Sequence, residues 1–231
     1  MKYPERTVTV SFVILTFLII IIGVFVNSQI KLGFADADNP AVMMALLSKH
    51  VHVYRSSGIV FVGMAVSLAF ALSAMWEIYS PKPSHAARVG FLFCAFCTAF
   101  FLAFGLLRMQ STGTLRHLES INQEWAQAGY MVVQVAGTQG YISAAVVSFA
   151  FFMMCISFDN IKSRRFAIWL SWAGMAGPSF VLFMLFFGPF FPGLDNLFPV
   201  YIFSILLIFL WPTFFGISLL RRSRISKELS T

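Results

Sequence analysis

Six long apolar segments that are almost free of charge constrain this chain more than any other feature of its sequence. The segments span residues 8–26, 56–79, 87–107, 132–158, 166–188 and 199–220. About 20 apolar residues in a helix cross a hydrocarbon core of ~30 Å, so each segment is long enough to span a membrane. No small-residue cleavage site follows the first segment, which favours a retained span over a signal peptide. The pattern predicts an all-α membrane protein, a bundle of six transmembrane helices.

The composition argues against a water-soluble domain. Hydrophobic residues make up 59% of the 231 residues and charged residues only 11%, whereas soluble domains carry about 25% charged residues. The net charge of +7 could indicate nucleic-acid binding in a soluble protein. Here the basic residues lie in short connections and tails, where they set orientation and contact anionic headgroups. We therefore expect membrane lipids as partners and no nucleic acid.

The distribution of Lys and Arg predicts the orientation of the spans. Eleven of these residues lie in the N-terminal tail, in the connections after the second and fourth segments, and in the C-terminal tail. Only five lie in or beside the longer connections on the other side. By the positive-inside rule, both termini are expected to face the cytoplasm of a bacterial inner membrane.

The two long connections are expected to lie on the extracytoplasmic side. In the first, residues 27–54, a turn at Asn39 and Pro40 precedes a short surface helix at 41–53. The second, residues 110–130, is polar and is expected to be a loop. We expect a single transmembrane domain over residues 1–231, with short extracytoplasmic surface helices.

Small residues and a proline mark two of the spans. Gly63, Ser67 and Ala71 recur every four residues in the second span, so they share one face against which another helix can pack closely. Pro178 lies near the middle of the fifth span, just after Gly177. It predicts a kink in that helix and not a break.

With these landmarks, the chain resembles a bacterial family of small six-span membrane proteins catalogued as a domain of unknown function, number four-three-eight-six. The matching stretches are YRSSGIVFVGMAVSLAFAL at the second span, GYISAAVVSFAFFMMCI in the fourth and SRRFAIWLSWAGMAG at the fifth. The last span departs from the family pattern, because LLIFLWPTFFG carries Pro212 and no acidic residue. The resemblance implies the six-span topology. It implies no substrate, cofactor or catalytic residue.

Charged residues at the outer ends of the spans are the candidate ligand-binding residues. Arg55 begins the second span and Arg108 ends the third, so a helical hairpin should hold both guanidinium groups at similar depth. Glu119, Glu124 and Asp195 are the acidic residues expected on the same side. Two interpretations stay open. The arginines either anchor the spans by reaching the headgroups, or form a shallow outward-facing site for an anionic ligand.

Other residues give little sign of chemistry. Cys94 and Cys97 form a C-x-x-C pair, but the pair lies inside an apolar span, where an activated thiolate is not expected. His50 and His52 alone are too few for a metal site, and the histidines lie outside the spans or at their edges. We expect no catalytic residue, no metal and no cofactor.

These observations favour a protein that is not an enzyme. The first hypothesis is an accessory or sensory protein that binds a lipid, a small amphiphile, a partner subunit or a second copy of itself at its outer face. The second is a small secondary transporter or permease-like carrier, with a cavity at mid-depth lined by Gln134, Thr138, Ser143 and the Pro178 kink. The third is an intramembrane enzyme that modifies lipid, which requires at least two polar catalytic groups close together.

Overall fold

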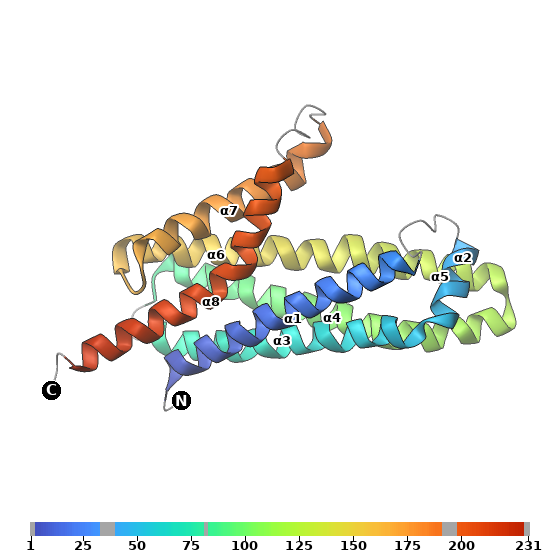
Figure 1. Ribbon diagram of the computed structural model, residues 1–231, viewed down its shortest axis with the longest axis horizontal. Helices are drawn as coiled ribbons and strands as arrows, with labels where there is room; N and C mark the ends of the chain where they lie inside the picture. The colour runs from blue at the N-terminus through green and yellow to red at the C-terminus, as the bar shows by residue number, and fades with distance from the viewer. Residues whose placement is uncertain (1–2, 33–39, 81–82, 191–197, 229–231) are drawn as a thin grey trace. The chain divides into compact units, whose positions relative to one another are not determined.

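The structure is almost entirely helical over the residues that the computed structural model describes, namely 3–32, 40–80, 83–190 and 198–228 (Figure 1). The elements are α1 (Pro4–Lys31), α2 (Pro40–Lys49), α3 (Val51–Tyr79), α4 (His85–Ile121), α5 (Gln123–Gln134), the π-helical segment η1 (Val135–Ile142), α6 (Ser143–Ser163), α7 (Ile168–Phe187), the 3₁₀ turn η2 (Gly188–Phe190) and α8 (Phe198–Glu228). Six helical stretches of this described part are long and apolar enough to cross a membrane. The predicted all-α fold with six spans is confirmed, and the chain is a multi-pass membrane protein.

The second long connection is helical, so the prediction of a loop at 110–130 is wrong. α4 runs for 37 residues to Ile121, and α5 begins at Gln123. A helix of that length measures about 55 Å, well beyond a hydrocarbon core of ~30 Å. The last turns of α4 therefore continue past Ser111, where its apolar stretch ends. Asn122 turns the chain, because its Oδ1 accepts the backbone N–H of Glu124 at 2.8 Å and caps α5.

The chain divides into two compact units. Unit 1 comprises Met1–Thr16, Ser67–Cys97 and Val146–Thr231, and unit 2 comprises Phe17–Val66 and Thr98–Ala145. Helices α1, α3 and α4 are each divided between the two units, with one end in unit 1 and the other end in unit 2. The single transmembrane domain stays a prediction, and the two units are described separately below.

An aromatic core on α8 organises unit 1. The rings of Trp211 and Phe215 stack at 4.8 Å, and Phe166 and Phe12 pack edge-on against Phe215 at 4.7 and 5.9 Å. α7 and α8 run along each other here (Figure 1), and the indole Nε1 of Trp211 donates a hydrogen bond to the carbonyl of Leu170 at 2.8 Å. In lipid, packing and interhelical hydrogen bonds of this kind hold helices together.

Short polar side chains join α1 to α8 within unit 1. The Thr9 hydroxyl donates to the carbonyl of Gly216 at 2.8 Å, and the hydroxyls of Thr16 and Thr213 are 2.8 Å apart. A Cβ on Gly216 would lie 2.8 Å from the Cα of Thr9, so glycine is needed for this close approach. The threonines satisfy their hydroxyls inside the helix pair, where lipid offers no partner.

The small-residue face of α3 packs as predicted. In unit 2, a Cβ on Gly63 would lie 3.3 Å from Cδ1 of Leu18 on α1. In unit 1, the Ser67 hydroxyl donates to the carbonyl of Ser11 on α1 at 2.7 Å, and Ala71 is fully buried.

Pro178 does not break α7, which continues from Ile168 to Phe187. This part of the prediction is confirmed, and the kink itself stays a prediction. Gly174, one turn earlier, faces Ser157 and Trp211 so closely that a side chain there would displace them.

A buried asparagine fixes the turn between α6 and α7 in unit 1. The Asn160 side chain is 0% exposed and makes three hydrogen bonds. Its Nδ2 donates to the carbonyl of Phe166 at 3.1 Å and to Ser171 Oγ at 2.8 Å. Its Oδ1 accepts a hydrogen bond from the N–H of Phe166 at 2.9 Å. Arg164 ends α6 with a φ of 53°, and its N–H bonds to the carbonyl of Asn160 at 2.9 Å. A left-handed residue at this position closes a helix, although glycine is the usual choice.

Candidate functional site

The site begins where α3 and α4 cross in unit 2. A Cβ on Gly58 would lie 2.8 Å from the carbonyl oxygen of Gly105, and a Cβ on Gly105 would lie 2.8 Å from the carbonyl oxygen of Gly58. No larger residue fits this crossing without moving the helices apart. Arg108 is one turn after Gly105, and its Cβ is 3.2 Å from the position of a Cβ on Gly58. The crossing therefore holds the root of the Arg108 side chain against α3.

The guanidinium group of Arg108 lies among aromatic rings. Its Cζ is 4.0 Å from the ring centroid of Tyr54 and 5.4 Å from that of Phe104. Its Nε is buried and has no hydrogen-bond partner. Within the described residues, the titratable groups that act on Arg108 are Tyr54 and Tyr130, with no carboxylate among them. Arg108 is thus a cation without a counter-charge in the described part of the protein.

Ser111 adds a second polar group on the same face of α4. Residues three apart on a helix are neighbours, so Ser111 lies one turn beyond Arg108. Its side chain is 6% exposed, and its buried Oγ has no hydrogen-bond partner. A buried donor without a partner costs about 1–3 kcal/mol, and an acceptor on a bound ligand or a water molecule would remove this cost.

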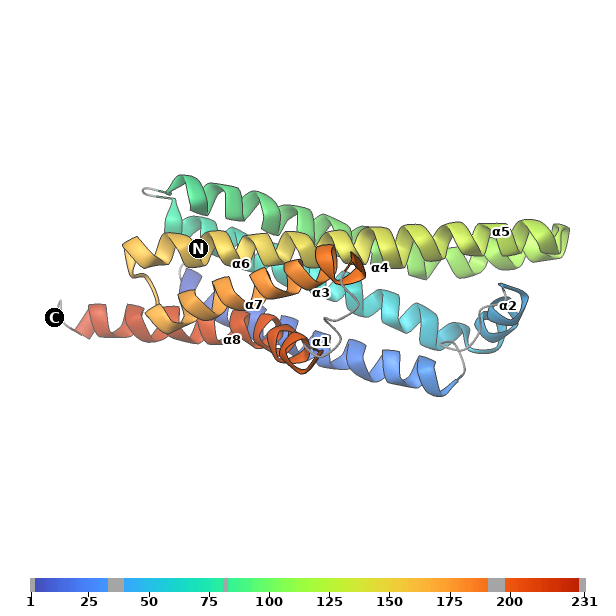
Figure 2. The ribbon, with the colours of Figure 1, turned by 90° about the horizontal axis from the view of Figure 1, so that it is seen from above.

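An apolar cluster of unit 2 encloses this position. It consists of Met43, Met44, Leu47, Tyr54, Leu115, Ala126 and Tyr130, with Leu46 and Leu118 packed against it. The cluster joins α2, the start of α3, the end of α4 and α5, which turns back along α4 (Figures 1 and 2). The guanidinium group of Arg108 lies over the ring of Tyr54 of this cluster, and Tyr130 lies close enough to act on its charge.

Tyr130 does not supply the missing counter-charge. The pKa of Tyr130 is raised to about 12, chiefly by burial and to a lesser extent by negative charge on Tyr54, and Arg108 offsets part of this increase. The phenol is therefore neutral at physiological pH and provides Arg108 with an aromatic neighbour only.

The four predicted site residues have different surroundings. Arg55 is exposed, and its Nη2 lies 3.7 Å from the position of a Cβ on Gly113 of α4. Both arginines thus lie where α3 meets α4, and Arg108 is the one whose guanidinium group lies over the rings of Tyr54 and Phe104. Glu124 is exposed in the first turn of α5 and is not among the groups that act on Arg108. Asp195 lies outside the described residues, and the binding role of all four stays a prediction.

Sequence reasoning missed Tyr54, Ser111 and Tyr130. The spacing of Ser111 from Arg108 was a usable signal, because a serine three residues after an arginine shares its helix face. Tyr130 gave no such signal, since its position beside Arg108 depends on α5 folding back along α4.

The segment η1 follows α5 in unit 2. A Cβ on Gly137 in this segment would lie 2.9 Å from Cε2 of Phe104, the ring that neighbours Arg108. π-Helical segments occur frequently at functional sites. The side chains of Gln134 and Thr138, expected to line a carrier cavity, lie outside the described residues, so that expectation stays a prediction.

Chemistry based on metal or thiol groups has no support in the described part of the chain. It holds no group of three or more His, Cys, Asp or Glu residues arranged to bind a metal ion. Cys94 and Cys97 are buried in unit 1 and form no disulfide with each other. Arg108 and its neighbours suggest binding of an anion.

Residues 10–222 match the family described as Domain of unknown function (DUF4386). The chain belongs to the DUF4386 family. The match runs from α1 into α8, so each of the six membrane-spanning helices contributes to it, and the family resemblance in the sequence is confirmed. No curated protein and no solved structure matches the chain. Because the DUF4386 description names no activity, the function has to be inferred from the site.

Proposed function

We propose that this DUF4386 protein is an accessory or sensory protein of the inner membrane that binds an anionic amphiphile at Arg108. The ligand group is a carboxylate or a phosphate, and the site opens toward the extracytoplasmic side. The observation that supports the proposal is the guanidinium group of Arg108, held between Tyr54 and Phe104 with its Nε unbonded. The Lys and Arg distribution supports the orientation, because it favours cytoplasmic termini.

The free energy of a buried cation argues for a ligand. Taking an ion out of water costs several kcal/mol, and a cation–π contact returns only about 0.5–2 kcal/mol of this. A carboxylate or phosphate oxygen pair can accept two parallel N–H bonds from one guanidinium group. The Ser111 hydroxyl can donate a further bond, and Met43 and Met44 offer an adaptable apolar surface for an alkyl chain.

Arg165 of unit 1 is a second arginine that lies over a tyrosine ring. Its Cζ lies 4.5 Å from the ring centroid of Tyr79, much as Arg108 lies over Tyr54. However, its Nη1 also donates to the carbonyl of Ile78 at 3.2 Å, at the C-terminal end of α3, where a cation is favourable. The Nε of Arg165 is buried and unbonded like that of Arg108, so the two arginines differ only in the carbonyl acceptor at Nη1 of Arg165.

The test compares Arg108→Met, Arg108→Lys and Arg55→Met in the purified full chain. Methionine keeps much of the side-chain volume and removes the charge, lysine keeps the charge and loses the planar fork, and Arg55 is the exposed control. Thermal unfolding is measured in neutral detergent with and without an anionic lipid or a fatty acid, and co-purifying lipid is identified by mass spectrometry.

The expected results separate a ligand site from a membrane anchor. An anionic amphiphile should stabilise the wild type and Arg55→Met, but neither Arg108 variant. Loss of a charge-assisted hydrogen bond of about 1.5–3 kcal/mol should weaken binding by roughly tenfold or more. In lipid-free detergent, Arg108→Met should be as stable as the wild type or more so, because an uncompensated charge is gone. Equal stabilisation of Arg108→Met and the wild type by the amphiphile would contradict the proposal.

The second candidate function is a small secondary transporter, and η1 favours it. Irregular backbone at membrane depth is tolerated where it is buried in protein or lines a water-filled cavity. The test is Thr138→Cys in a background without Cys94, Cys97 and Cys155, labelled from either side by a membrane-impermeant thiol reagent. Labelling from both sides supports a carrier, whereas protection from both sides rejects it.

A further inference from the structure

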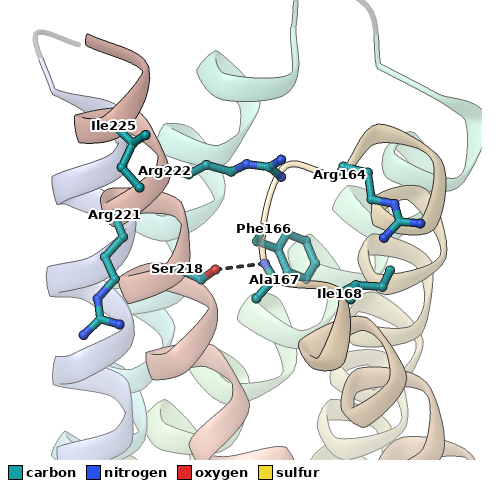
Figure 3. Close-up of a pocket in the computed structure, with 8 residues that line it drawn as sticks. All are labelled: Arg164, Phe166, Ala167, Ile168, Ser218, Arg221, Arg222 and Ile225. Atoms are coloured by element: carbon teal, nitrogen blue, oxygen red, sulfur yellow. Dashed lines mark hydrogen bonds between the residues drawn. The ribbon is translucent and has the colours of Figure 1, made fainter. Parts of the chain in front are cut away.

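A pocket of about 540 Å³ lies at the start of α7 and the end of α8 in unit 1 (Figure 3). Its walls come from the α6–α7 turn and from the last turns of α8. The lining residues are Arg164, Phe166, Ala167, Ile168, Ser218, Arg221, Arg222 and Ile225. None of them belongs to the Arg108 site, which lies in unit 2.

Hydrogen bonds fix the walls of the pocket. The backbone N–H of Ala167 donates to Ser218 Oγ at 2.9 Å, which ties the α6–α7 turn to α8 (Figure 3). On the other side of the turn, the Asn160 side chain bonds to both the N–H and the carbonyl of Phe166. The pocket is therefore built into the packing of unit 1 and does not depend on flexible surface side chains alone.

The charge of the pocket is of one sign. Three of the lining residues are arginines, and none is acidic. α7 also begins here, at the N-cap Ala167, and no side chain caps it. The N-terminus of a helix carries a partial positive charge and favours anions. The three arginines are exposed to solvent, which screens their mutual repulsion, and a bound anion would lower it further.

The remaining lining residues distinguish a lipid from a free anion. Phe166, Ile168 and Ile225 give the pocket apolar walls beside the guanidinium groups. The apolar stretches of α7 and α8 end close by, at Ile168 and Ser223, so the pocket lies at the depth of the lipid headgroups. An anionic phosphodiester with acyl chains attached matches both the charge and the apolar walls.

We propose that this pocket binds the phosphate group of an anionic phospholipid, on the side of the membrane expected to face the cytoplasm. In Figure 3, Arg222 extends from α8 toward the α6–α7 turn, whereas the guanidinium groups of Arg221 and Arg164 point away from it on either side of the pocket. Arg222 is therefore the principal phosphate ligand, while Arg164 and Arg221 line the same pocket and contribute positive charge. The proposal is independent of the function proposed for the Arg108 site.

The test uses the purified full chain titrated with short-chain phosphatidylglycerol, phosphatidylcholine or inorganic phosphate, with binding followed by native mass spectrometry. The variants are the double change Arg164→Gln with Arg222→Gln, and the control Arg221→Gln. Phosphatidylglycerol should bind more tightly than the zwitterionic lipid, and the double variant should lose about tenfold or more in affinity. Arg221→Gln and Arg108→Met should bind like the wild type.

Two results would overturn the proposal. If Arg221→Gln weakens binding as much as the double variant, the lipid responds only to net charge. If inorganic phosphate displaces phosphatidylglycerol at equal concentration, the pocket holds a free anion and not a lipid.

A second measurement avoids the arginine variants altogether. Ile225→Cys, in a background without the native cysteines, should react with a soluble maleimide several-fold more slowly when phosphatidylglycerol is bound. An unchanged labelling rate at saturating lipid also rejects the pocket as the binding site.

Discussion

Replacing Asn160 by alanine should destabilise unit 1 more than replacing any one exposed side chain that makes hydrogen bonds. The substitution removes three hydrogen bonds, two of them to the N–H and carbonyl of Phe166, which is itself 1% exposed. Each bond contributes about 1 kcal/mol net, and a stranded buried backbone group costs ~1 kcal/mol or more in addition. The expected loss is therefore about 3–4 kcal/mol, because no water reaches Phe166 to replace the lost partner.

The native cysteines provide the assay. Cys94 and Cys97 are fully buried in unit 1, so a fluorogenic maleimide reacts with them only when that unit unfolds. All variants carry Cys155→Ala, because Cys155 is partly exposed and would react in the folded protein. A loss of about 3 kcal/mol should lower the midpoint of thermal unfolding by roughly 6–12 °C for a chain of this size.

The matched control is Asn122→Ala. Asn122 is exposed and caps α5 through its Oδ1, so its loss should cost only about 1 kcal/mol. A second variant, Asn160→Asp, keeps the acceptor for the Phe166 N–H but loses both donated bonds and places a carboxylate against the Phe166 carbonyl. It should be at least as unstable as Asn160→Ala at neutral pH. If Asn160→Ala unfolds at the same temperature as Asn122→Ala, the argument that Asn160 holds the turn is wrong.

Three further predictions concern the other elements. Gly105→Ala places a Cβ 2.8 Å from the Gly58 carbonyl oxygen and should lower the free energy of unfolding by about 1–3 kcal/mol, measured by thermal melts. The control Gly23→Ala, whose Cβ would have no atom within 4 Å, should be neutral or stabilising. Equal effects of the two substitutions would contradict the close crossing of α3 and α4. The pKa of Tyr130 is about 12 in the folded protein against 10 when unfolded, so its neutral phenol contributes stability below pH 10, and this contribution is lost as pH rises from 10 to 12. The stability of Tyr130→Phe should therefore fall less steeply with pH over that range than that of the wild type. An unchanged fall would count against the burial of Tyr130. Alkaline phosphatase should be inactive when fused after Thr231 and active when inserted at Asn122, and the reverse pattern would place the Arg108 site on the cytoplasmic side.

The six spans could be predicted from the sequence because crossing a membrane is a one-dimensional requirement. Lipid offers no hydrogen-bond partner, so an uninterrupted apolar run of sufficient length has to be a helix whatever packs beside it. The close packing of Gly63 and Ser67 on α1 followed in the same way, since small residues at a spacing of four always share a helix face.

The conformation of the polar connections could not be predicted in this way. The polarity of residues 110–130 indicates that they lie outside the lipid, but it does not distinguish a loop from a helix that continues into water. α4 continues because its backbone bonds are local and because Leu115 on its last turns packs against Ala126 and Tyr130 of α5. That packing exists only once α5 folds back along α4.

The character of the individual arginines was likewise decided by tertiary structure. The sequence places Arg55 and Arg108 at the outer ends of their spans as equivalent cations. The Gly58–Gly105 crossing and the rings of Tyr54 and Phe104 enclose Arg108, whereas Arg55 stays exposed beside Gly113. Burial depends on which side chains the neighbouring helices supply, and that information is spread over α2, α3, α4 and α5.

The α6–α7 turn and the pocket beside it depend on contacts that the local sequence does not encode. Nothing around Asn160 distinguishes it from a polar residue of a solvent-exposed turn until Phe166 and Ser171 are brought to its side chain. In the same way, Arg164 and Arg222 are 58 positions apart and line one pocket only because Ala167 bonds to Ser218 across the α7–α8 pair. The sequence by itself determines which segments enter the lipid, through their length and polarity, and the packing of helices distant in the chain determines which polar groups are enclosed.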